Sequence, residues 1–427
     1  MARSTRFGSA ARAAGFGGGS HWIVIVFLSS LSGCREQRSA DVEPTRPSVT
    51  DLPGDRTPAK HEPVAPTAGS PEGPLVIIGG RLDPDNRPIY EAIWTRRGGA
   101  GGICVVPTAS AEPAKSMSDY VGDFERFFGP DAAIGLSVFD GDLAAAGSQE
   151  LASLASGCGG FFFTGGDQSR IVDTFFSVDA SGTRRPSVVM AAILERHRSG
   201  AVVAGTSAGA AMMSDPMIGG GSSRDALARG VCDRDGCAGV WLRRGVGLLP
   251  GWITDQHFVE RGRVGRLVVA MLEDPVRPRM GLGVGENTAV VLDGDRASVV
   301  GSSGVVRLDP RAATYEAERG SWSGLTLDYF SDGMHFGLLT PTPIPSIPTP
   351  AEPLGATRSG AEDAFESTAL FDSLWEAEVE PCRGVTWSGE GWTLTFEPLA
   401  CSTPGREDRS STPRSFVVSL EAERELR

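Results

Sequence analysis

Short, uninterrupted apolar runs recur along the first half of the chain, and most are followed by segments with apolar residues every three or four positions. The runs predict strands at 75–78, 103–106, 136–139, 160–163 and 201–204. The longer segments predict helices at 89–97, 116–128, 168–177 and 186–198, and the segment 143–155 is rich in alanine. Apolar runs without alternation are typical of parallel strands that are covered on both faces. This rhythm predicts an α/β fold with a doubly wound, mostly parallel sheet.

The pattern changes beyond residue 280, where 283–292 and 297–308 predict antiparallel strands that close the domain. We therefore place the main domain at 74–340. Residues 341–353 are rich in proline and predict a polyproline-type linker. In the C-terminal extension, 354–427, a few apolar residues predict a small β-unit: Trp387, Trp392, Leu394 and Phe396. The extension shows no catalytic pattern, so its role stays open.

Residues 1–34 have the pattern of a lipoprotein signal segment. Basic residues precede an apolar run at 22–31, which is too short to cross a bilayer of about 30 Å as a helix and fits a signal peptide. The run ends in LSGC at 31–34, which resembles a bacterial lipobox, so we expect an acylated Cys34 that anchors the chain to the outer membrane or cell surface. A plain secretory signal with a chance cysteine is the alternative. Residues 35–73, rich in proline and charge, predict a disordered tether.

The net charge of −13 argues against a nucleic-acid partner, because phosphate binding needs clustered lysine and arginine. The cysteines of an exported protein can form disulfides, because the compartments outside the cytosol are oxidising. Two pairs are spaced to form disulfides, Cys232 with Cys237 and Cys382 with Cys401. Cys104 and Cys158 lie in apolar stretches and are interpreted as buried thiols. No cysteine–histidine spacing indicates a metal site, and no pattern calls for a cofactor.

The sequence GTSAG at 205–209 follows a predicted strand and matches the pattern G-x-S-x-G. A tight strand-to-helix turn exposes such a serine in a strained conformation, and glycines two positions either side let neighbouring backbone pass close by. The pattern therefore predicts a nucleophile elbow with Ser207 as nucleophile. The amide of the next residue, Ala208, is then expected to face a developing oxyanion.

A serine nucleophile needs a general base. His21 and His61 fall in the signal segment and the tether. His197 lies on a charged helix face, where we interpret it as solvated, and His335 lies in a late, turn-like segment. His257 lies in a loop before an amphipathic helix and is the best candidate for the base. Its alternative role is that of a helix-start histidine bonded to backbone.

A third group is needed to orient the imidazole. Glu286, beside glycines at a strand start, is the candidate, and Asp255 is the other; a surface turn acid is the alternative interpretation of Glu286. Gly166 comes just after the strand 160–163, where free amides suit an anion, so we expect it to supply a second oxyanion amide. A plain turn with Asp167 as helix N-cap is the alternative, and the two are compatible.

Three arginines follow His257, at 261, 263 and 266. If a helix begins near residue 258, Arg263 and Arg266 point away from its apolar face and Arg261 lies near the margin. That placement is typical of a solvated basic face. The alternative is carboxylate binding by one or two of the planar guanidinium groups in an otherwise acidic protein.

Together these motifs resemble cyanophycinase and the wider dipeptidase E-like serine peptidases. The resemblance covers roughly 74–310, and four segments carry it: FFTGGDQ at 162–168, GTSAGAA at 205–211, DQHF at 255–258 with the three arginines, and GENTA at 285–289. It implies a fold like the class I glutamine amidotransferase core, a Ser-His-Glu site and release of β-Asp-Arg dipeptides from cyanophycin, an aspartate polymer with arginine on each β-carboxyl. The implied substrate-pocket residues are Gln168, Asp255, Gln256, Arg261, Arg263 and Arg266.

Two features depart from that family. Gly285 stands where the family usually carries an aspartate before the glutamate, and the segment 219–245 is longer than usual and is placed to roof the pocket. The expected substrate is therefore the cyanophycin polymer or a small isoaspartyl peptide. Two functions compete: an α/β-hydrolase esterase, whose triad order of Ser, acid and His differs from the order here, and a non-catalytic lipoprotein that keeps the fold as a binding module. The oligomeric state stays open.

Overall fold

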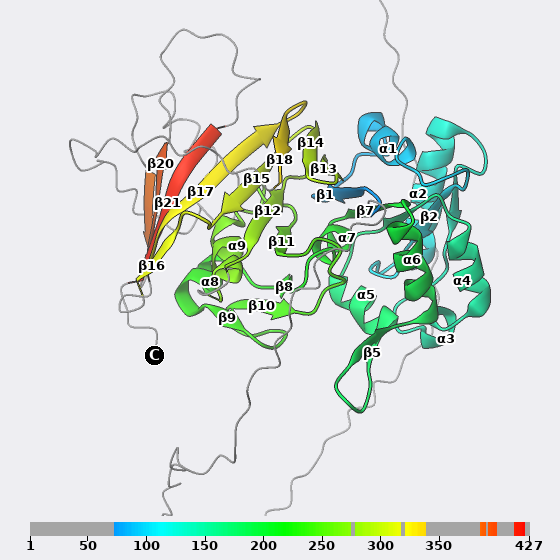
Figure 1. Ribbon diagram of the computed structural model, residues 1–427, viewed down its shortest axis with the longest axis horizontal. Coiled ribbons are helices and arrows are strands. Elements are labelled where there is room, and N and C mark those ends of the chain that lie inside the picture. Colours follow the sequence, from blue (N-terminus) through cyan, green and yellow to red (C-terminus); the bar gives the residue numbers. More distant parts are fainter. Residues whose placement is uncertain are drawn as a thin grey trace, which may run out of the picture. The chain divides into compact units, whose positions relative to one another are not determined.

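The computed structural model describes residues 72–274, 278–316, 321–338, 385–389, 392–398 and 414–422. Several sequence predictions fall outside these residues: the signal segment with Cys34, nearly all of the tether, the linker 341–353, and the pair Cys382 and Cys401. In the described part, helices and strands alternate along the first half, and strands alone follow toward the end (Figure 1).

The first sheet has parallel strands in the order β1, β7, β4, β2, β3. Their bounds are β1 Leu75–Ile78, β2 Ile103–Val106, β3 Ala133–Gly135, β4 Gly160–Phe163 and β7 Val202–Thr206. Antiparallel strands extend it beyond β1: β13 Thr288–Asp293, β14 Arg296–Gly301 and β18 His335–Gly337. This is the mostly parallel α/β sheet that the apolar runs predict.

Two hydrophobic cores cover the faces of this sheet, because successive strand residues point to opposite sides. Val76 and Ile78 pack with residues of α1 and α2, whereas Leu75 and Ile77 share a core with residues of α4, α5 and α6. The helix bounds are α1 Arg87–Trp94, α2 Pro113–Phe128, α3 Leu143–Ala146, α4 Gln149–Ser156, α5 Gln168–Phe175, α6 Val188–Arg198 and α7 Ala208–Ala211. Burial on both faces explains why the strands carry uninterrupted apolar runs.

The second sheet follows the order β11, β12, β15, β17, β21, β20, β19, and β16 pairs with β17. The bounds are β11 Trp252–Asp255, β12 Met280–Val284, β15 Gly304–Asp309, β16 Thr314–Glu316, β17 Ser321–Ser331, β19 Val385–Gly389, β20 Trp392–Pro398 and β21 Arg414–Ala422. Helix α9, Val264–Met271, contributes Leu267 to the same core as Leu394 and Phe396. The predicted C-terminal β-unit therefore continues the sheet that carries β11.

Two smaller elements complete the described part. Strands β8 Met217–Gly220, β9 Val231–Cys232 and β10 Val240–Arg243 form a three-stranded sheet, with helix α8, Ser223–Arg229, between β8 and β9. Strands β5 Phe176–Val178 and β6 Arg184–Pro186 form a hairpin. The segment 219–245 that the sequence marks as unusual supplies most of this small sheet and all of α8.

The predicted third strand is shifted toward the N-terminus. The strand is Ala133–Gly135, not 136–139. Leu136 and Val138 are fully buried, which explains their apolar character, but this backbone leaves the ladder and the Val138 carbonyl accepts a hydrogen bond from Thr108 Oγ1 at 2.6 Å.

The predicted strands 283–292 and 297–308 are each two strands that belong to different sheets. The chain leaves the second sheet at the end of β12 and enters the first at β13, and it returns between β14 and β15. Asn287, with φ 49°, lies on the first crossing. The connection from β12 to β13 lies beside the start of β15, where the Gly285 amide donates a hydrogen bond to the Gly304 carbonyl.

The structure also tests the predictions for two pairs of cysteines and for His197. The prediction of free buried thiols is wrong: Cys104 and Cys158 form a disulfide, because β2 and β4 are neighbouring strands. The local disulfide between Cys232 and Cys237 is confirmed. His197 is buried rather than solvated; its Nδ1 lies 3.0 Å from the Ala201 carbonyl oxygen, and burial lowers its pKa.

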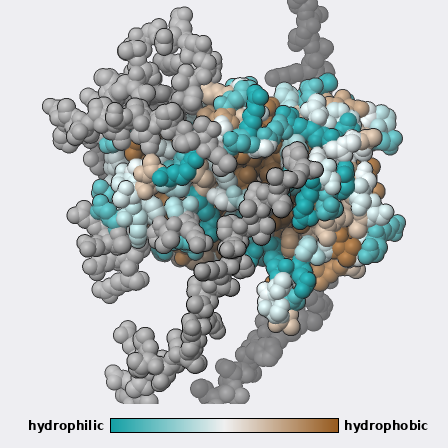
Figure 2. Space-filling view, in the orientation of Figure 1, coloured by the Kyte–Doolittle hydropathy of each residue, from teal (hydrophilic) through white to brown (hydrophobic). Residues whose placement is uncertain are grey.

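No helix among the described residues is long and apolar enough to cross a membrane. Figure 2 shows hydrophilic and apolar residues interspersed over the visible face, with an apolar area near α3, where Leu143 is 65% exposed. Exposed apolar side chains are common on protein surfaces, so this area identifies no site.

Candidate active site

Ser207 occupies a sharp turn between β7 and α7. Its φ of 53° and ψ of −108° lie outside the regions that side chains favour. The flanking glycines are required sterically: a Cβ at Gly205 would lie 2.2 Å from the Gly209 carbonyl oxygen, and one at Gly209 would lie 2.4 Å from the Phe163 carbonyl oxygen. The turn therefore has the geometry that G-x-S-x-G predicts, with the serine hydroxyl lining a cavity.

His257 lies just beyond β11 and presents its ring to Ser207. The imidazole Nε2 is 2.9 Å from Ser207 Oγ. The His257 backbone has φ 46°, and its amide donates to the Gly79 carbonyl at 2.6 Å. A Cβ at Gly80 would lie 2.3 Å from the imidazole Cε1, so the glycine that follows β1 makes room for the ring.

Glu286 lies on the crossing between the two sheets and holds the other ring nitrogen. Its Oε1 is 2.7 Å from His257 Nδ1. The Glu286 amide donates to Glu260 Oε2 at 2.9 Å, and Ser303 Oγ donates to Glu260 Oε1 at 2.7 Å. Glu260 therefore fixes the backbone that carries Glu286. Glu260 is not among the residues predicted from the sequence, and no pattern in the chain marks it.

Burial dominates the electrostatics of His257 and lowers its pKa. The positive charges of Arg261 and Arg263 act in the same direction, whereas the hydrogen bond that Glu286 accepts from the imidazole opposes them. A lowered pKa keeps the imidazole neutral near pH 7, as a general base requires.

The two predicted oxyanion donors lie in suitable backbone. Ala208 follows Ser207 directly, and Gly166 lines the cavity beside Ser207, with a φ of 137° that favours glycine. In the described part of the chain, no hydrogen bond is formed by the amide of either residue. Asp167 caps α5 by accepting a hydrogen bond from the Ser169 amide at 2.8 Å, so the turn and the cap coexist as predicted.

Ser207 and His257 open into a cavity of about 740 Å³. Among the predicted substrate-binding residues, Gln168, Gln256, Arg261, Arg263 and Arg266 line it. The lining residues that no sequence pattern marked are Ser169, Asp173, Asp235, Trp241 and Arg243, with the backbone of Gly219 to Gly221. Most of them come from the segment 219–245, which forms a wall of the cavity, consistent with its predicted place above the pocket.

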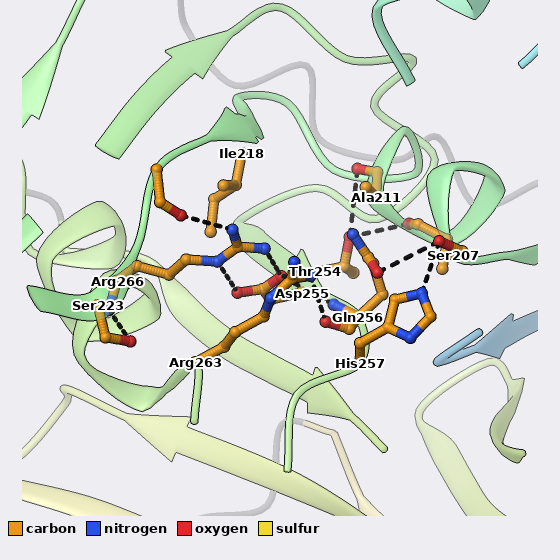
Figure 3. A network of polar contacts seen from close by, with 12 residues as sticks. Ser207, Ala211, Ile218, Ser223, Thr254, Asp255, Gln256, His257, Arg263 and Arg266 are labelled. Atoms are coloured by element: carbon orange, nitrogen blue, oxygen red, sulfur yellow. Dashed lines mark hydrogen bonds and ion pairs between the residues drawn. The ribbon is translucent and has the colours of Figure 1, made fainter. Parts of the chain in front are cut away.

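Arg266 and Asp255 form a buried ion pair (Figure 3). Arg266 Nη2 and Nε lie 2.5 and 2.7 Å from the two carboxylate oxygens of Asp255, and Nη1 donates to the Gly221 carbonyl at 2.7 Å. The helix begins at Val264 instead of near 258, so Arg266 turns inward, and the solvated basic face is wrong for this residue. Asp255 does not line the cavity, and its carboxylate pairs with Arg266 and, at 3.6 Å, with Arg263 Nη1, rather than with His257.

Gln168 has a similar anchoring role. Its Nε2 donates to the carbonyl of Ile218 at 2.8 Å and to that of Gly219 at 3.2 Å. Gln168 and Arg266 therefore hold β8 and the residues after it in place. The Gln168 amide and the Arg266 guanidinium therefore already have protein partners, whereas Arg261 is exposed and Arg263 remains partly open to the cavity.

Arg261 and Arg263 supply the positive charge of the cavity. Arg261 is exposed, and the Arg263 side chain keeps 13% exposure while its Nη1 donates to the Gln256 carbonyl at 2.6 Å. Burial and the charge of Arg266 lower the pKa of Arg263 to about 9, which leaves the group charged at neutral pH. Gln256 also accepts a hydrogen bond from Ser207 Oγ at 3.3 Å (Figure 3). The described residues contain no cluster of three or more His, Cys, Asp or Glu side chains arranged for a metal ion.

Known proteins match this region. The model of peptidase family S51 matches residues 75–300. A cyanophycinase of Trichormus variabilis is 34% identical over 284 residues, which are 64% of this chain and 88% of that protein. A cyanophycinase of Geminocystis herdmanii is 32% identical over 246 residues, 56% of this chain and 82% of that protein. Among solved structures, a peptidase from an acI-B1 Actinobacterium covers 56% of this chain and 91% of its own, at 20% identity and a TM-score of 0.42.

The matched residues contain Ser207, His257 and Glu286 in that order. This order, with the acid last, is not that of an α/β-hydrolase, so the esterase alternative has no support. The non-catalytic alternative also falls, since the matching family is one of peptidases. The chain therefore belongs to peptidase family S51 and is a serine-type peptidase.

Proposed function

We propose that this peptidase hydrolyses cyanophycin, or isoaspartyl peptides of the same chemistry, through an acyl-enzyme on Ser207. The observation that carries the proposal is a cavity in which the Ser207–His257 pair opens beside two charged arginines, Arg261 and Arg263. The cyanophycinases that match at 34% and 32% identity support the same substrate class.

The chemistry of the substrate fits the charges of the cavity. Each pendant arginine of cyanophycin presents an α-carboxylate and a guanidinium group beside the aspartate backbone. Planar guanidinium groups bind carboxylates through paired hydrogen bonds, so Arg261 and Arg263 are the groups that we assign to the α-carboxylate. Fixing this carboxylate holds the backbone carbonyl against Ser207 Oγ, and such orientation supplies much of the lowering of the barrier.

The proposed reaction has two steps. His257 Nε2 takes the proton from Ser207 Oγ as the hydroxyl attacks the carbonyl carbon, and Glu286 stabilises the imidazolium that forms. The amides of Gly166 and Ala208 stabilise the oxyanion. His257 then protonates the departing amine as the C–N bond breaks. A water molecule, deprotonated by His257, hydrolyses the ester and regenerates the Ser207 hydroxyl.

Incubation of the purified chain with insoluble cyanophycin tests the proposal, with β-Asp-Arg measured by mass spectrometry. We expect dipeptide release that falls at least tenfold in Arg263→Ala and stays unchanged in Arg296→Ala, an exposed arginine on β14. Small isoaspartyl dipeptides are assayed in parallel. Cleavage of dipeptides without cleavage of the polymer would keep the reaction and discard cyanophycin, and ester hydrolysis alone would overturn the proposal.

We also propose that the protein is exported and held at a membrane by an acylated Cys34. The signal-like segment and the LSGC sequence at 31–34 support this. The disulfides Cys104–Cys158 and Cys232–Cys237 add support, because disulfides persist in oxidising compartments. We expect Cys34→Ser to move the protein from the membrane fraction to the soluble fraction, whereas Cys104→Ser should leave it at the membrane. Continued membrane binding of Cys34→Ser would contradict the anchor.

A further inference from the structure

The turn between β9 and β10 is closed on itself and forms part of the rim of the active-site cavity. Cys232, the last residue of β9, is joined by a disulfide to Cys237, and the chain then enters β10 at Val240. Close backbone packing holds the base of the turn: a Cβ at Gly221 would lie 2.2 Å from the Gly239 carbonyl oxygen, and one at Gly239 would lie 2.6 Å from that of Gly230. The residue that this turn presents to the cavity is Asp235.

Asp235 differs from the other acidic residues of the cavity. Asp173 Oδ1 is 2.5 Å from Arg243 Nη2, and Asp167 caps α5. Asp235 is exposed, and within the described residues its carboxylate has no hydrogen bond or ion pair. A carboxylate held at a cavity rim without a partner is available to a cationic ligand.

An aromatic ring lies on the strand beside this turn. Trp241 pairs in register with Cys232 on one side and with Gly220 on the other, and it lines the same cavity. Its indole lies against β8, because a Cβ at Gly219 would be 2.4 Å from the ring atom Cε3. The Arg243 guanidinium carbon lies 5.1 Å from the ring centroid, so this ring already has a guanidinium group nearby. Aromatic faces and carboxylates are the two groups that bind guanidinium best in proteins.

We propose that Asp235 binds the cationic side chain of the substrate, with Trp241 beside it, while Arg261 and Arg263 bind the carboxylate. This rests on the proposed function and adds the residue that selects a guanidinium group. The Cys232–Cys237 disulfide is then a positioning device: it holds the carboxylate at the rim, so that the cavity accepts a zwitterionic ligand with its two charges at separate places.

Binding without turnover tests this assignment. In a Ser207→Ala background, calorimetry compares β-Asp-Arg with β-Asp-citrulline, a neutral ligand of nearly the same shape. We expect Asp235→Asn to weaken β-Asp-Arg by about threefold to tenfold, the range of an exposed to partly buried charge pair, and to leave β-Asp-citrulline unchanged. Asp233→Asn is the matched control, because Asp233 is exposed in the same disulfide-closed turn and does not line the cavity.

A second variant separates position from charge. Cys232→Ser with Cys237→Ser keeps Asp235 but frees the turn, so we expect a smaller loss for β-Asp-Arg and no change for β-Asp-citrulline. Equal binding of both ligands by the Ser207→Ala parent, an unchanged affinity in Asp235→Asn, or an equal loss in Asp233→Asn would overturn the assignment. A charge-selective Asp235 in a protein that releases nothing from cyanophycin would leave this assignment standing and remove only the proposed substrate.

Discussion

At the scale of single residues, backbone strain is concentrated at the site. Non-glycine residues with positive φ include Ser207, His257, Asn287 and Arg81. Ser207 and His257 contact each other, Asn287 follows Glu286, and Arg81 Nε lies 3.3 Å from Glu286 Oε1. Such conformations cost about 1–3 kcal/mol each, and they persist only where the surroundings impose them. The strain that brings Ser207, His257 and Glu286 together therefore lowers the stability of the fold.

The triad residues differ in the size of their expected effects. Ser207→Ala and His257→Ala should each lower kcat by several powers of ten, because these groups act as a unit. Glu286→Gln should be milder, since its role is to orient the ring and stabilise its charged form. Peptide cleavage measured beside a thermal unfolding scan separates catalysis from folding. A His257→Ala enzyme with full activity would refute the assignment of the base.

The pH profile follows from the lowered pKa of His257. The base acts when neutral, so kcat/KM falls as the pH drops below the His257 pKa, and the acid limb should lie below the ordinary value of about 6.5. The Arg261 cation disfavours a charged imidazole. Arg261→Gln should therefore raise this pKa and move the acid limb to higher pH, whereas Arg296→Gln on β14 should not. A limb that does not move in Arg261→Gln would mean that the Arg261 charge does not contribute to the pKa of His257.

At the scale of elements, the connections between strands position the chemistry. Ser207 follows β7, Gly166 follows β4 and His257 follows β11, each at the carboxyl end of its strand. In doubly wound sheets these ends form the binding crevice. Only Ser207 separates β7 from α7. Gly205 and Gly209 allow the strand and the helix to approach this closely.

A glycine comparison tests this close approach. Gly205→Ala places a Cβ 2.2 Å from the Gly209 carbonyl oxygen and should destabilise the protein by about 1–3 kcal/mol, with a further loss of activity through displacement of Ser207. Gly122→Ala, at an exposed position in α2 with no neighbour within 4 Å, should instead stabilise it by about 0.5–1 kcal/mol. Urea unfolding measures both. Equal stability of the two variants would contradict the steric argument.

At the scale of the described molecule, the active site depends on two sheets. Ser207 extends from the first sheet, His257 follows β11 of the second, and Glu286 lies on the crossing between them. The second sheet also includes the C-terminal strands, because β21 pairs with β17 from Trp322 to Tyr329. The C-terminal strands therefore help to stabilise the sheet that carries His257.

Truncation tests this dependence. A chain that ends at residue 340 lacks β19, β20 and β21 and exposes the apolar side of β17, including Leu325 and Leu327. We expect a lower unfolding temperature and aggregation at micromolar concentration. A chain that ends at residue 422 keeps all the described strands and serves as the control. Equal unfolding temperatures would mean that the extension folds independently.

The amino-acid sequence was sufficient to predict the class of fold and the three residues Ser207, His257 and Glu286. Strands buried on both faces must be apolar throughout, so β1, β2 and β4 appear directly as apolar runs. The turn at Ser207 is recognisable in the sequence because a strained strand-to-helix turn requires glycines at fixed spacing around the serine. His257 followed from the scarcity of histidines, Glu286 from the glycines beside it, and both from the resemblance; the structure brings both into hydrogen-bond distance.

Which residues contact one another became known only from the tertiary structure. Whether Asp255 serves His257, a ligand or Arg266 depends on a helix start that shifted from near 258 to Val264, which local periodicity does not resolve. The Cys104–Cys158 disulfide and the division of 283–292 between two sheets both depend on which strands are neighbours. Strand order is set by packing between residues far apart in the chain. A sequence pattern records the burial of each residue and not the identity of its neighbours.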